Sequence, residues 1–458
     1  MAQRSLKSIK GGGTSVQSGR HIRHFIRNVI HAVESRRGVT VSAPAGVTDK
    51  LDAWITPYGW HAASEEVRVL HQRYPSKDDI MMDVRGLFAS IVDEVGISLD
   101  VAGAFDAIRN ECGHLKSTGN AAALRDFAIT RGEQLNAEIV AKAAGFHLVN
   151  ATELIVLNEK GQWEEGATRA LATRMNLRQL SEEGFVIGGF HGRSGADPDR
   201  VVAFSRGGSD ITGAIIAKLI SASEYENWTD VEGVLTADPR IVMNARKILR
   251  MSFDELLELA YTGAKVFHPS AVRPVAEAGI PVHIRCTATP NVEGTWILPY
   301  LEPVPGSITG VAHRDGFSML RIRKIGMNDE RGFDALLNGV LLGMKMSFHH
   351  KPTGIDSMAV VLPTAEVNSR KHELQQALRA KCGIDEVHIE DGFTMICTVG
   401  AGIVNDPSVL AKFFGALNIA NVKTSIIDKG GSDMNMIIGV RESQSREAIV
   451  AIHDAFLC

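Results

Sequence analysis

The sequence predicts an α/β fold in which a mostly parallel sheet, covered by helices on both faces, is followed by two smaller β-α-β modules. Short β-branched runs alternate with helical patterns through the first 300 residues, and this alternation favours parallel strands joined by helices. Residues 299–306 contain three prolines and one glycine, which is typical of a linker. Beyond the linker lies a weak internal repeat with a period of roughly 75 residues.

The composition indicates a globular protein with sizeable cores. Its 458 residues predict about three domains, and 45% hydrophobic against 22% charged residues exclude a disordered or collagen-like chain. The net charge of −4 shows no basic bias, so we expect no nucleic-acid partner. No apolar run approaches the roughly 20 residues that span a bilayer, and no apolar stretch typical of a signal peptide follows the basic N-terminus. We therefore expect a soluble, cytoplasmic protein with no membrane partner.

The cysteines support the same location. They are dispersed and form no Cys-x-x-Cys pair, which predicts free thiols rather than a disulfide or zinc scaffold. The five positions are Cys112, Cys286, Cys382, Cys397 and Cys458.

The elements of the first 300 residues are predicted in order. A strand at 39–41 precedes a Pro-Gly turn, and residues 64–108 have the mostly helical composition of a helical subdomain. Apolar residues at helical spacing continue over 126–144. Further short strands are predicted at 154–157, 185–187, 201–204, 231–235 and 282–284.

The internal repeat beyond the linker predicts two copies of one small unit that pack together. In the first copy, a strand at 319–325 leads to Gly332 and an apolar helix at 335–342. In the second copy, a strand at 394–399 leads to a helix at 408–417 and a strand at 424–427. Asp406 suits the N-cap of that helix and Pro407 its first turn.

Residues 10–15 (Lys-Gly-Gly-Gly-Thr-Ser) lie between a predicted strand at 6–9 and a predicted helix that contains Ile22, Phe25 and Val29. Successive glycines at this place let backbone N–H groups approach an anion, and a lysine beside them neutralises phosphate. The lysine precedes the glycines, so this is not a Walker A loop. An ordinary glycine-rich turn has the same appearance, and the loop alone leaves both interpretations open.

A second glycine-rich loop, Arg206-Gly207-Gly208-Ser209-Asp210, follows the strand at 201–204 and opens a predicted helix. The Arg206 guanidinium can fork onto a carboxylate, and Asp210 can hold an ammonium group, a combination that suits an amino acid. A capping role for Asp210 with a solvated Arg206 is the competing interpretation. Two further stretches carry charged residues at turns, namely 228–240 and 263–269, and in the latter a structural role is predicted for His268.

Taken together these stretches resemble the aspartokinases of the amino acid kinase family, followed by two ACT regulatory modules. The resemblance rests on residues 10–16, 41–48, 131–133, 149–156, 206–210, 228–240 and 263–269, in the family's order, and on residues 394–440 for the second ACT module. It implies a three-layer kinase domain at 1–300 with a helical subdomain at about 60–120. A linker at 301–312 and two ferredoxin-like α+β ACT domains at 313–388 and 389–458 are then expected.

The resemblance implies transfer of the ATP γ-phosphoryl group to the β-carboxylate of L-aspartate, the first step of the pathway to lysine, threonine and methionine. Mg²⁺ on the ATP phosphates is the expected metal, with no protein metal site. The implied catalytic residues are Lys10, Gly12, Gly13 and Asp210. The implied substrate residues are Ser42, Thr48, Glu133, Arg206, Ser209 and Asp210. The implied nucleotide residues are Lys10, Gly12, Gly13, Thr229, Asp230, Leu235, Asp238, Arg240 and Lys265.

The sequence departs from the family pattern at three places. Gly11 replaces a bulkier residue after the lysine, and Leu235 replaces a common aromatic residue. The first ACT copy carries acids where effector sites usually have small or apolar residues. Its candidate regulatory residues are Met327, Glu330, Phe333 and Asp334. Three interpretations remain open: the acids pair with the ammonium group of a lysine effector, the site binds no ligand, or the acids belong to a solvated loop.

By the same resemblance we expect a homo-oligomer, at least a dimer, with lysine or threonine as a feedback effector. No homoserine dehydrogenase unit follows the second module, so a monofunctional enzyme is expected. One alternative is a kinase of another acid such as N-acetylglutamate, although Glu133 and Asp210 favour a free amino group. A catalytically silent ACT-based amino-acid sensor is the alternative from another class.

Overall fold

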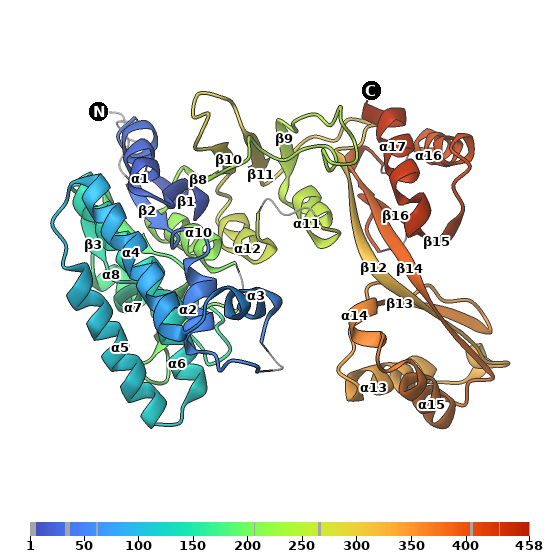
Figure 1. Cartoon of the computed structure of the whole chain (residues 1–458). Coiled ribbons are helices and arrows are strands. Elements are labelled where there is room, and N and C mark those ends of the chain that lie inside the picture. The colour runs from blue at the N-terminus through green and yellow to red at the C-terminus, as the bar shows by residue number, and fades with distance from the viewer. Residues whose placement is uncertain are drawn as a thin grey trace. The chain divides into compact units, whose positions relative to one another are not determined.

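The computed structural model describes residues 6–32, 37–60, 63–205, 207–263, 267–403, 406–429 and 431–457. The chain forms two compact units (Figure 1). The first contains Met1–Val234, Leu249–Phe253 and Val266–Leu301. The second contains Leu235–Ile248, Asp254–Lys265 and Glu302–Cys458. Two segments from the last quarter of the first 300 residues therefore belong to the second unit.

The first unit is built on an eight-stranded sheet in the described part of the chain. Neighbouring strands pair in parallel, except for the antiparallel pair β10–β11. The predicted mostly parallel sheet is thus confirmed. The strand order is β3 (His147–Val149), β5 (Phe185–Gly188), β2 (Arg37–Val41), β1 (Lys7–Gly11), β8 (Glu224–Thr229), β10 (Val282–Cys286), β11 (Thr295–Leu298) and β9 (Arg250–Ser252).

Helices cover both faces of this sheet. On one face, Ile9 of β1 and Val39 and Val41 of β2 join a large apolar core with helices α1 (Gly19–Phe25), α2 (Val47–Ile55), α4 (Lys77–Val95), α5 (Val101–Ser117) and α6 (Ala121–Ala144). On the other face lie α9 (Leu177–Glu183), α10 (Gly208–Ile220) and α12 (Pro269–Glu277). The predicted helical subdomain corresponds to α3 (Glu65–Arg73), α4 and α5, and the helix predicted at 126–144 begins earlier, at Ala121.

A smaller three-stranded sheet adjoins α6 and contains β4 (Val156–Leu157), β6 (His191–Ser194) and β7 (Val201–Ala203). The strand predicted at 154–157 is only partly right, because Asn150 caps a short helix α7 (Ala151–Leu154) that uses its first residue. α8 (Glu165–Arg174) follows β4.

The strand predicted at 231–235 is wrong. The strand in this region is β8, whose Tyr225 and Trp228 are fully buried and whose backbone pairs with β1 and β10. After β8 the chain turns, and Gly233 takes a left-handed φ of 134° that a strand does not allow. The apolar residues at 231–235 belong to the turn that follows β8, not to a strand.

The second unit contains an antiparallel sheet of five strands in its described part. The order is β13 (Ser357–Pro363), β12 (Gly310–Arg323), β14 (Glu386–Val399), β16 (Asn435–Arg441) and β15 (Thr424–Asp428). β12 lies mostly in the first predicted copy and β14 mostly in the second, and the two strands pair with each other, so the two copies share one sheet. The strand predicted at 319–325 ends two residues earlier than expected.

Each end of this sheet has its own apolar core. One core includes α13 (Phe333–Gly343), α14 (Thr364–Val367) and α15 (Lys371–Cys382). The other includes α16 (Pro407–Ile419) and α17 (Ser445–Leu457), together with Ala237 and Val242. Asp406 caps α16 and Pro407 occupies its first turn, as predicted.

Helix α11 (Phe253–Tyr261) is joined to the rest of the second unit by hydrogen bonds that two of its glutamates accept. Glu255 Oε1 accepts hydrogen bonds from the Thr309 hydroxyl at 2.5 Å and from the Ala401 N–H at 3.1 Å. Glu258 Oε2 accepts one from Asn435 Nδ2 at 2.7 Å. The boundaries predicted for the linker and the two modules stay a prediction.

Two further observations concern the described ranges. No helix there combines the length and apolar character needed to cross a bilayer. Cys112, Cys286, Cys382 and Cys397 are buried free thiols, as predicted, whereas Cys458 lies outside the described residues.

Candidate active site

Several predicted site residues of the first unit lie at or after the carboxyl ends of three adjacent strands, β2, β1 and β8, namely Lys10, Gly12, Gly13, Ser42, Thr48, Thr229 and Asp230. Glu133 comes from α6 instead, and Ser209 and Asp210 come from the first turn of α10. These strands are parallel, so their carboxyl ends meet at one edge of the sheet. Ligands of open α/β sheets bind at this edge.

Strand periodicity places Lys10 on the face that carries α10. Residues two apart share a face of a strand, and the Ser8 hydroxyl donates to the Gly213 carbonyl of α10 at 2.8 Å, while Ile9 joins the opposite core. Lys10 pairs in register with Asn227 of β8. Both side chains therefore project toward α10.

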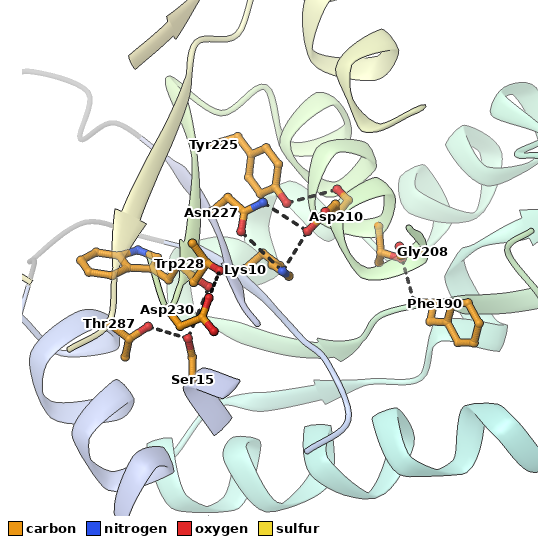
Figure 2. Close-up of polar contacts among 12 residues, drawn as sticks. Lys10, Ser15, Phe190, Gly208, Asp210, Tyr225, Asn227, Trp228, Asp230 and Thr287 are labelled. Atoms are coloured by element: carbon orange, nitrogen blue, oxygen red, sulfur yellow. Dashed lines mark hydrogen bonds and ion pairs between the residues drawn. The ribbon is translucent and has the colours of Figure 1, made fainter. Parts of the chain in front are cut away.

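Lys10, Asp210 and Asn227 form a closed polar triangle (Figure 2). Lys10 Nζ lies 2.8 Å from Asp210 Oδ1 and 3.4 Å from Asn227 Oδ1, and Asn227 Nδ2 donates to Asp210 Oδ1 at 3.2 Å. The Lys10 side chain is 11% exposed and that of Asp210 is 19% exposed. The ammonium is thus held in place but remains accessible from the edge of the sheet.

Asp210 is fixed by the start of α10. Gly207 precedes the helix with a left-handed φ of 61°, and Asp210 occupies the first turn. The Tyr225 hydroxyl donates to the Asp210 carbonyl at 3.1 Å. Asp210 does not cap the helix, so the competing capping interpretation is wrong. Arg206 lies outside the described residues.

The glycine loop turns sharply after β1. The Gly12 N–H donates to the Trp228 carbonyl at 2.9 Å, so this amide is already engaged. A Cβ on Gly13 would come within 2.9 Å of the Ala43 carbonyl oxygen, so only glycine fits there. Ser15 Oγ lies 2.6 Å from Thr287 Oγ1 and 3.5 Å from the Trp228 carbonyl, which holds the end of the loop against β8 and β10 (Figure 2).

A second group of predicted residues lies beside this loop. The Ser42 N–H donates to the Gly11 carbonyl at 3.1 Å, and Asn136 Nδ2 donates to the Ser42 carbonyl at 2.7 Å. The Thr48 hydroxyl lies 3.4 Å from Glu133 Oε1. Residues 42–48 are therefore held between the loop and α6.

Glu133 is buried within α6 at only 4% exposure. Burial raises the pKa of its carboxyl to about 8, against opposing hydrogen bonds and the nearby Arg131. Its Oε2 atom has no hydrogen-bond partner in the described structure. A buried carboxyl with an unsatisfied oxygen is suited to receive an ammonium group.

The turn after β5 brings α6 and α10 together. A Cβ on Gly188 would lie 3.0 Å from the Glu133 carbonyl oxygen, and one on Gly189 would lie 2.6 Å from Ser209 Oγ. Phe190 has a left-handed φ of 73°, which is strained for an aromatic residue, and its N–H donates to the Thr212 hydroxyl at 3.3 Å. Ser209 thus lies close to the backbone that also contacts Glu133.

The predicted nucleotide residues are divided between the two units. Thr229 and Asp230 follow β8 in the first unit, and the Thr229 hydroxyl donates to Asp230 Oδ1 at 3.1 Å. Leu235, Asp238 and Arg240 belong to the second unit, where Arg240 forms an ion pair with Asp238 at 2.6 Å. Lys265 lies outside the described residues.

The candidate regulatory residues cluster at the start of α13. Met327 and Phe333 are buried, and Lys324 Nζ lies 5.2 Å from the centre of the Phe333 ring. Both acids are paired with lysines, namely Glu330 with Lys324 and Asp334 with Lys351. Neither acid is therefore unpaired in solvent.

Sequence reasoning missed three polar residues of the site, Asn136, Asn227 and Thr287. Asn136 and Asn227 are almost fully buried. No sequence pattern marks them, because β8 also contains Glu224 and Glu226 and α6 contains several charged residues.

Comparisons with known proteins agree with this geometry. Residues 9–286 match the family model described as amino acid kinase family, and residues 396–456 match an ACT domain model. Aspartokinase 3 of Bacillus subtilis is 31% identical over 469 residues, which cover 98% of each chain.

Solved structures are similar over the full length. Aspartate kinase from Clostridium acetobutylicum has 31% identity and a TM-score of 0.83, covering 99% of this chain and 100% of that one. E. coli aspartokinase III in complex with aspartate and ADP shares the fold at 24% identity, with a TM-score of 0.79 and coverage of 99% and 100%. The chain therefore belongs to the amino acid kinase family, among its aspartokinases, and carries a C-terminal ACT domain.

Proposed function

We propose that the protein transfers the γ-phosphoryl group of ATP to the β-carboxylate of L-aspartate, giving 4-phospho-L-aspartate and ADP. The observation that carries the proposal is the lysine held by Asp210 and Asn227 at the carboxyl edge of the sheet. The buried Glu133 carboxyl, whose Oε2 atom lacks a partner in the described structure, supports it. The bound aspartate and ADP in the E. coli relative support this choice of substrates.

The reaction needs charge neutralisation more than proton transfer. A carboxylate with an ordinary pKa near 3.9 is already ionised at neutral pH, so an oxygen of the substrate attacks the γ-phosphorus without a general base. The bond from the γ-phosphorus to the bridging oxygen breaks, and ADP leaves with the electron pair. Positioning and electrostatic stabilisation therefore account for the rate.

Each residue near the sheet edge then has a defined role. Lys10 stabilises charge on the transferring phosphoryl group, and Asp210 and Asn227 fix its ammonium position. The Gly13 amide is the loop donor in our proposal, because the Gly12 amide already binds the Trp228 carbonyl. Gly12 contributes the close turn.

On the substrate side, Glu133 receives the α-ammonium group and Arg206 receives the α-carboxylate. Ser42, Thr48 and Ser209 supply hydrogen bonds around the amino acid. Thr229 and Asp230 border the nucleotide in the first unit. A nucleotide role for Leu235, Asp238, Arg240 and Lys265 stays a prediction of the family resemblance.

ATP and Mg²⁺ fit the residues present. The turn leaves no room for a side chain at Gly13 and crowds one at Gly12, which is typical of a backbone cradle for phosphate. Mg²⁺ takes carboxylate and phosphate oxygens, and the Asp210 carboxylate is the acidic group placed beside Lys10. When bound to the ATP phosphates, the ion neutralises part of their charge.

The experiment that tests the function is ATP turnover with L-aspartate, with the acyl phosphate trapped by hydroxylamine as the hydroxamate. Parallel assays with N-acetylglutamate test the alternative substrate. Hydroxamate from aspartate alone is expected, product from N-acetylglutamate alone would assign the other substrate, and no product with either would favour a silent sensor.

We further propose feedback regulation by lysine or threonine through the ACT modules of a homo-oligomer that is at least a dimer. A lysine-sensitive aspartokinase 3 from E. coli, 30% identical over 289 residues, supports lysine as the first effector to test. Glu330 and Asp334 are already paired with lysine side chains, so an effector ammonium would have to displace one. Inhibition by lysine, threonine and methionine in the same assay tests this, and a cytoplasmic location stays a prediction.

A further inference from the structure

A basic cavity of about 610 Å³ lies on helix α1, away from the proposed catalytic residues. Four cations line it, namely Arg20, Arg23, Arg27 and Lys142, and the apolar side chains of Ile26 and Ile97 contribute to its wall. We call it the arginine cavity. Its volume lies in the range of small-molecule sites.

The positive charge of the arginine cavity is largely uncompensated. In the described part of the chain, the guanidinium groups of Arg20, Arg23 and Arg27 have no hydrogen-bonded or ion-paired partner. Lys142 pairs with Glu138 at 2.9 Å. Glu94 Oε2 accepts a hydrogen bond from the backbone N–H of Arg20 at 2.9 Å, not from its guanidinium group.

Part of this arrangement is unfavourable for the helix by itself, although Arg23 lies in the last turn of α1, where a cation suits the helix dipole. Like charges three or four residues apart repel, and a cation in the first turn opposes the helix dipole, each by a few tenths of a kcal/mol. Helix α1 has no acid in its first turn. It continues into a π-helical segment, Ile26–Ile30, and single π-turns are frequent at functional sites.

We propose that the arginine cavity binds a phosphorylated small molecule of about nucleotide size, separately from the catalytic residues. Guanidinium groups pair with phosphate oxygens through two parallel hydrogen bonds, and three arginines on one helix face suit several phosphate oxygens. The apolar wall formed by Ile26 and Ile97 gives a surface for the rest of the molecule.

The cavity is linked to the glycine loop by a short chain of contacts. His24, which also lines the cavity, places its Nε2 atom 2.7 Å from the Thr287 carbonyl oxygen. The Thr287 hydroxyl lies 2.6 Å from Ser15 Oγ (Figure 2). A ligand that moves α1 therefore acts on the loop that begins at Lys10.

The test measures binding of inorganic triphosphate to the full-length protein by calorimetry, at low and at physiological salt. In the double variant Arg23→Gln/Arg27→Gln, the affinity of one class of triphosphate sites is expected to fall at least 10-fold, because two guanidinium groups that donate paired hydrogen bonds are lost. The matched control, Arg68→Gln/Arg85→Gln, removes two exposed arginines of α3 and α4 and is expected to bind as the unmodified chain does.

Identical isotherms for the unmodified chain and the Arg23/Arg27 variant would overturn the proposal. So would binding of anionic phospholipid vesicles or polyglutamate, but not triphosphate, through the same arginines. Thermal unfolding of each variant checks that it folds, and the single variant Arg23→Gln replaces the double one if it does not. The KM for ATP is expected to be unchanged in the Arg23/Arg27 variant, so this binding is measured independently of the proposed phosphotransfer.

Discussion

Lys10 Nζ lies 2.8 Å from Asp210 Oδ1, although the two residues are 200 positions apart in the chain. The parallel pairing of β1 with β8 and the start of α10 bring them together. The pair places a positive charge where the proposed reaction develops negative charge.

Replacing Lys10 by alanine is expected to lower kcat by about 10²–10³-fold, because a preorganised charge stabiliser is lost from the transition state. Steady-state kinetics with ATP and aspartate measure this. Lys160→Ala, at an exposed loop position, is the control and should retain kcat. A change confined to KM in Lys10→Ala would contradict the role.

Asn227→Ala is expected to lower kcat by about 10-fold, since Asn227 orients both partners of the ion pair without carrying charge itself. Asn227→Asp should be worse, because a second carboxylate would compete for the Lys10 ammonium. Their kcat values are compared with that of Lys10→Ala, and an unchanged kcat in both variants would remove Asn227 from the site.

The Glu133 carboxyl is expected to release a proton when aspartate binds. Its raised pKa of about 8 keeps the carboxyl largely protonated at pH 7, and the substrate ammonium group favours the ionised form. The apparent affinity for aspartate should therefore rise with pH and level off above about 8. Calorimetry in buffers of different ionisation enthalpy measures the released proton.

The variant Glu133→Gln serves as the comparison. It should bind aspartate more weakly and release no proton at this position. Equal proton release in both proteins would show that another group titrates.

Arg206→Ala should raise the KM for aspartate far more than the KM for ATP, because the proposed partner of its guanidinium is the α-carboxylate. Initial-rate kinetics with each substrate varied in turn separate the two. Equal increases in both KM values would rule out this assignment.

Glu255→Ala is expected to destabilise the second unit by about 2–3 kcal/mol, because the Thr309 hydroxyl and the Ala401 N–H lose a buried acceptor. Thermal unfolding should show a lower Tm than for Asp254→Ala, which changes an exposed acid of the same helix. Equal Tm values would mean that these hydrogen bonds contribute little.

The local patterns of the sequence predicted much of the fold. Alternating β and α patterns gave the parallel sheet, and the Asp406-Pro407 pair marked the start of α16. Glycines at strand ends indicated the turn at Gly13, where a side chain has no room. These features depend on residues close together in the chain.

Features set by long-range pairing could not be predicted in this way. Asn227 faces Lys10 only because β8 pairs with β1 in one particular register. Glu133 has its raised pKa because tertiary packing buries it, and no motif signals that burial. The turn after β8 also has the apolar composition of a strand. The sequence does not show that Gly233 takes a left-handed φ, which ends the extended conformation.

The interleaving of the two units constrains protein engineering. Thr236 binds His453 Nε2 at 2.9 Å, and Ala237 and Val242 belong to the same core as Ile308 and Phe413. A fragment cut at residue 301 would keep these side chains and lose their surroundings, so it would expose apolar surface and tend to aggregate. Chimaeras that exchange the C-terminal part of the second unit with that of another kinase therefore also need residues 235–248 and 254–261 to be exchanged.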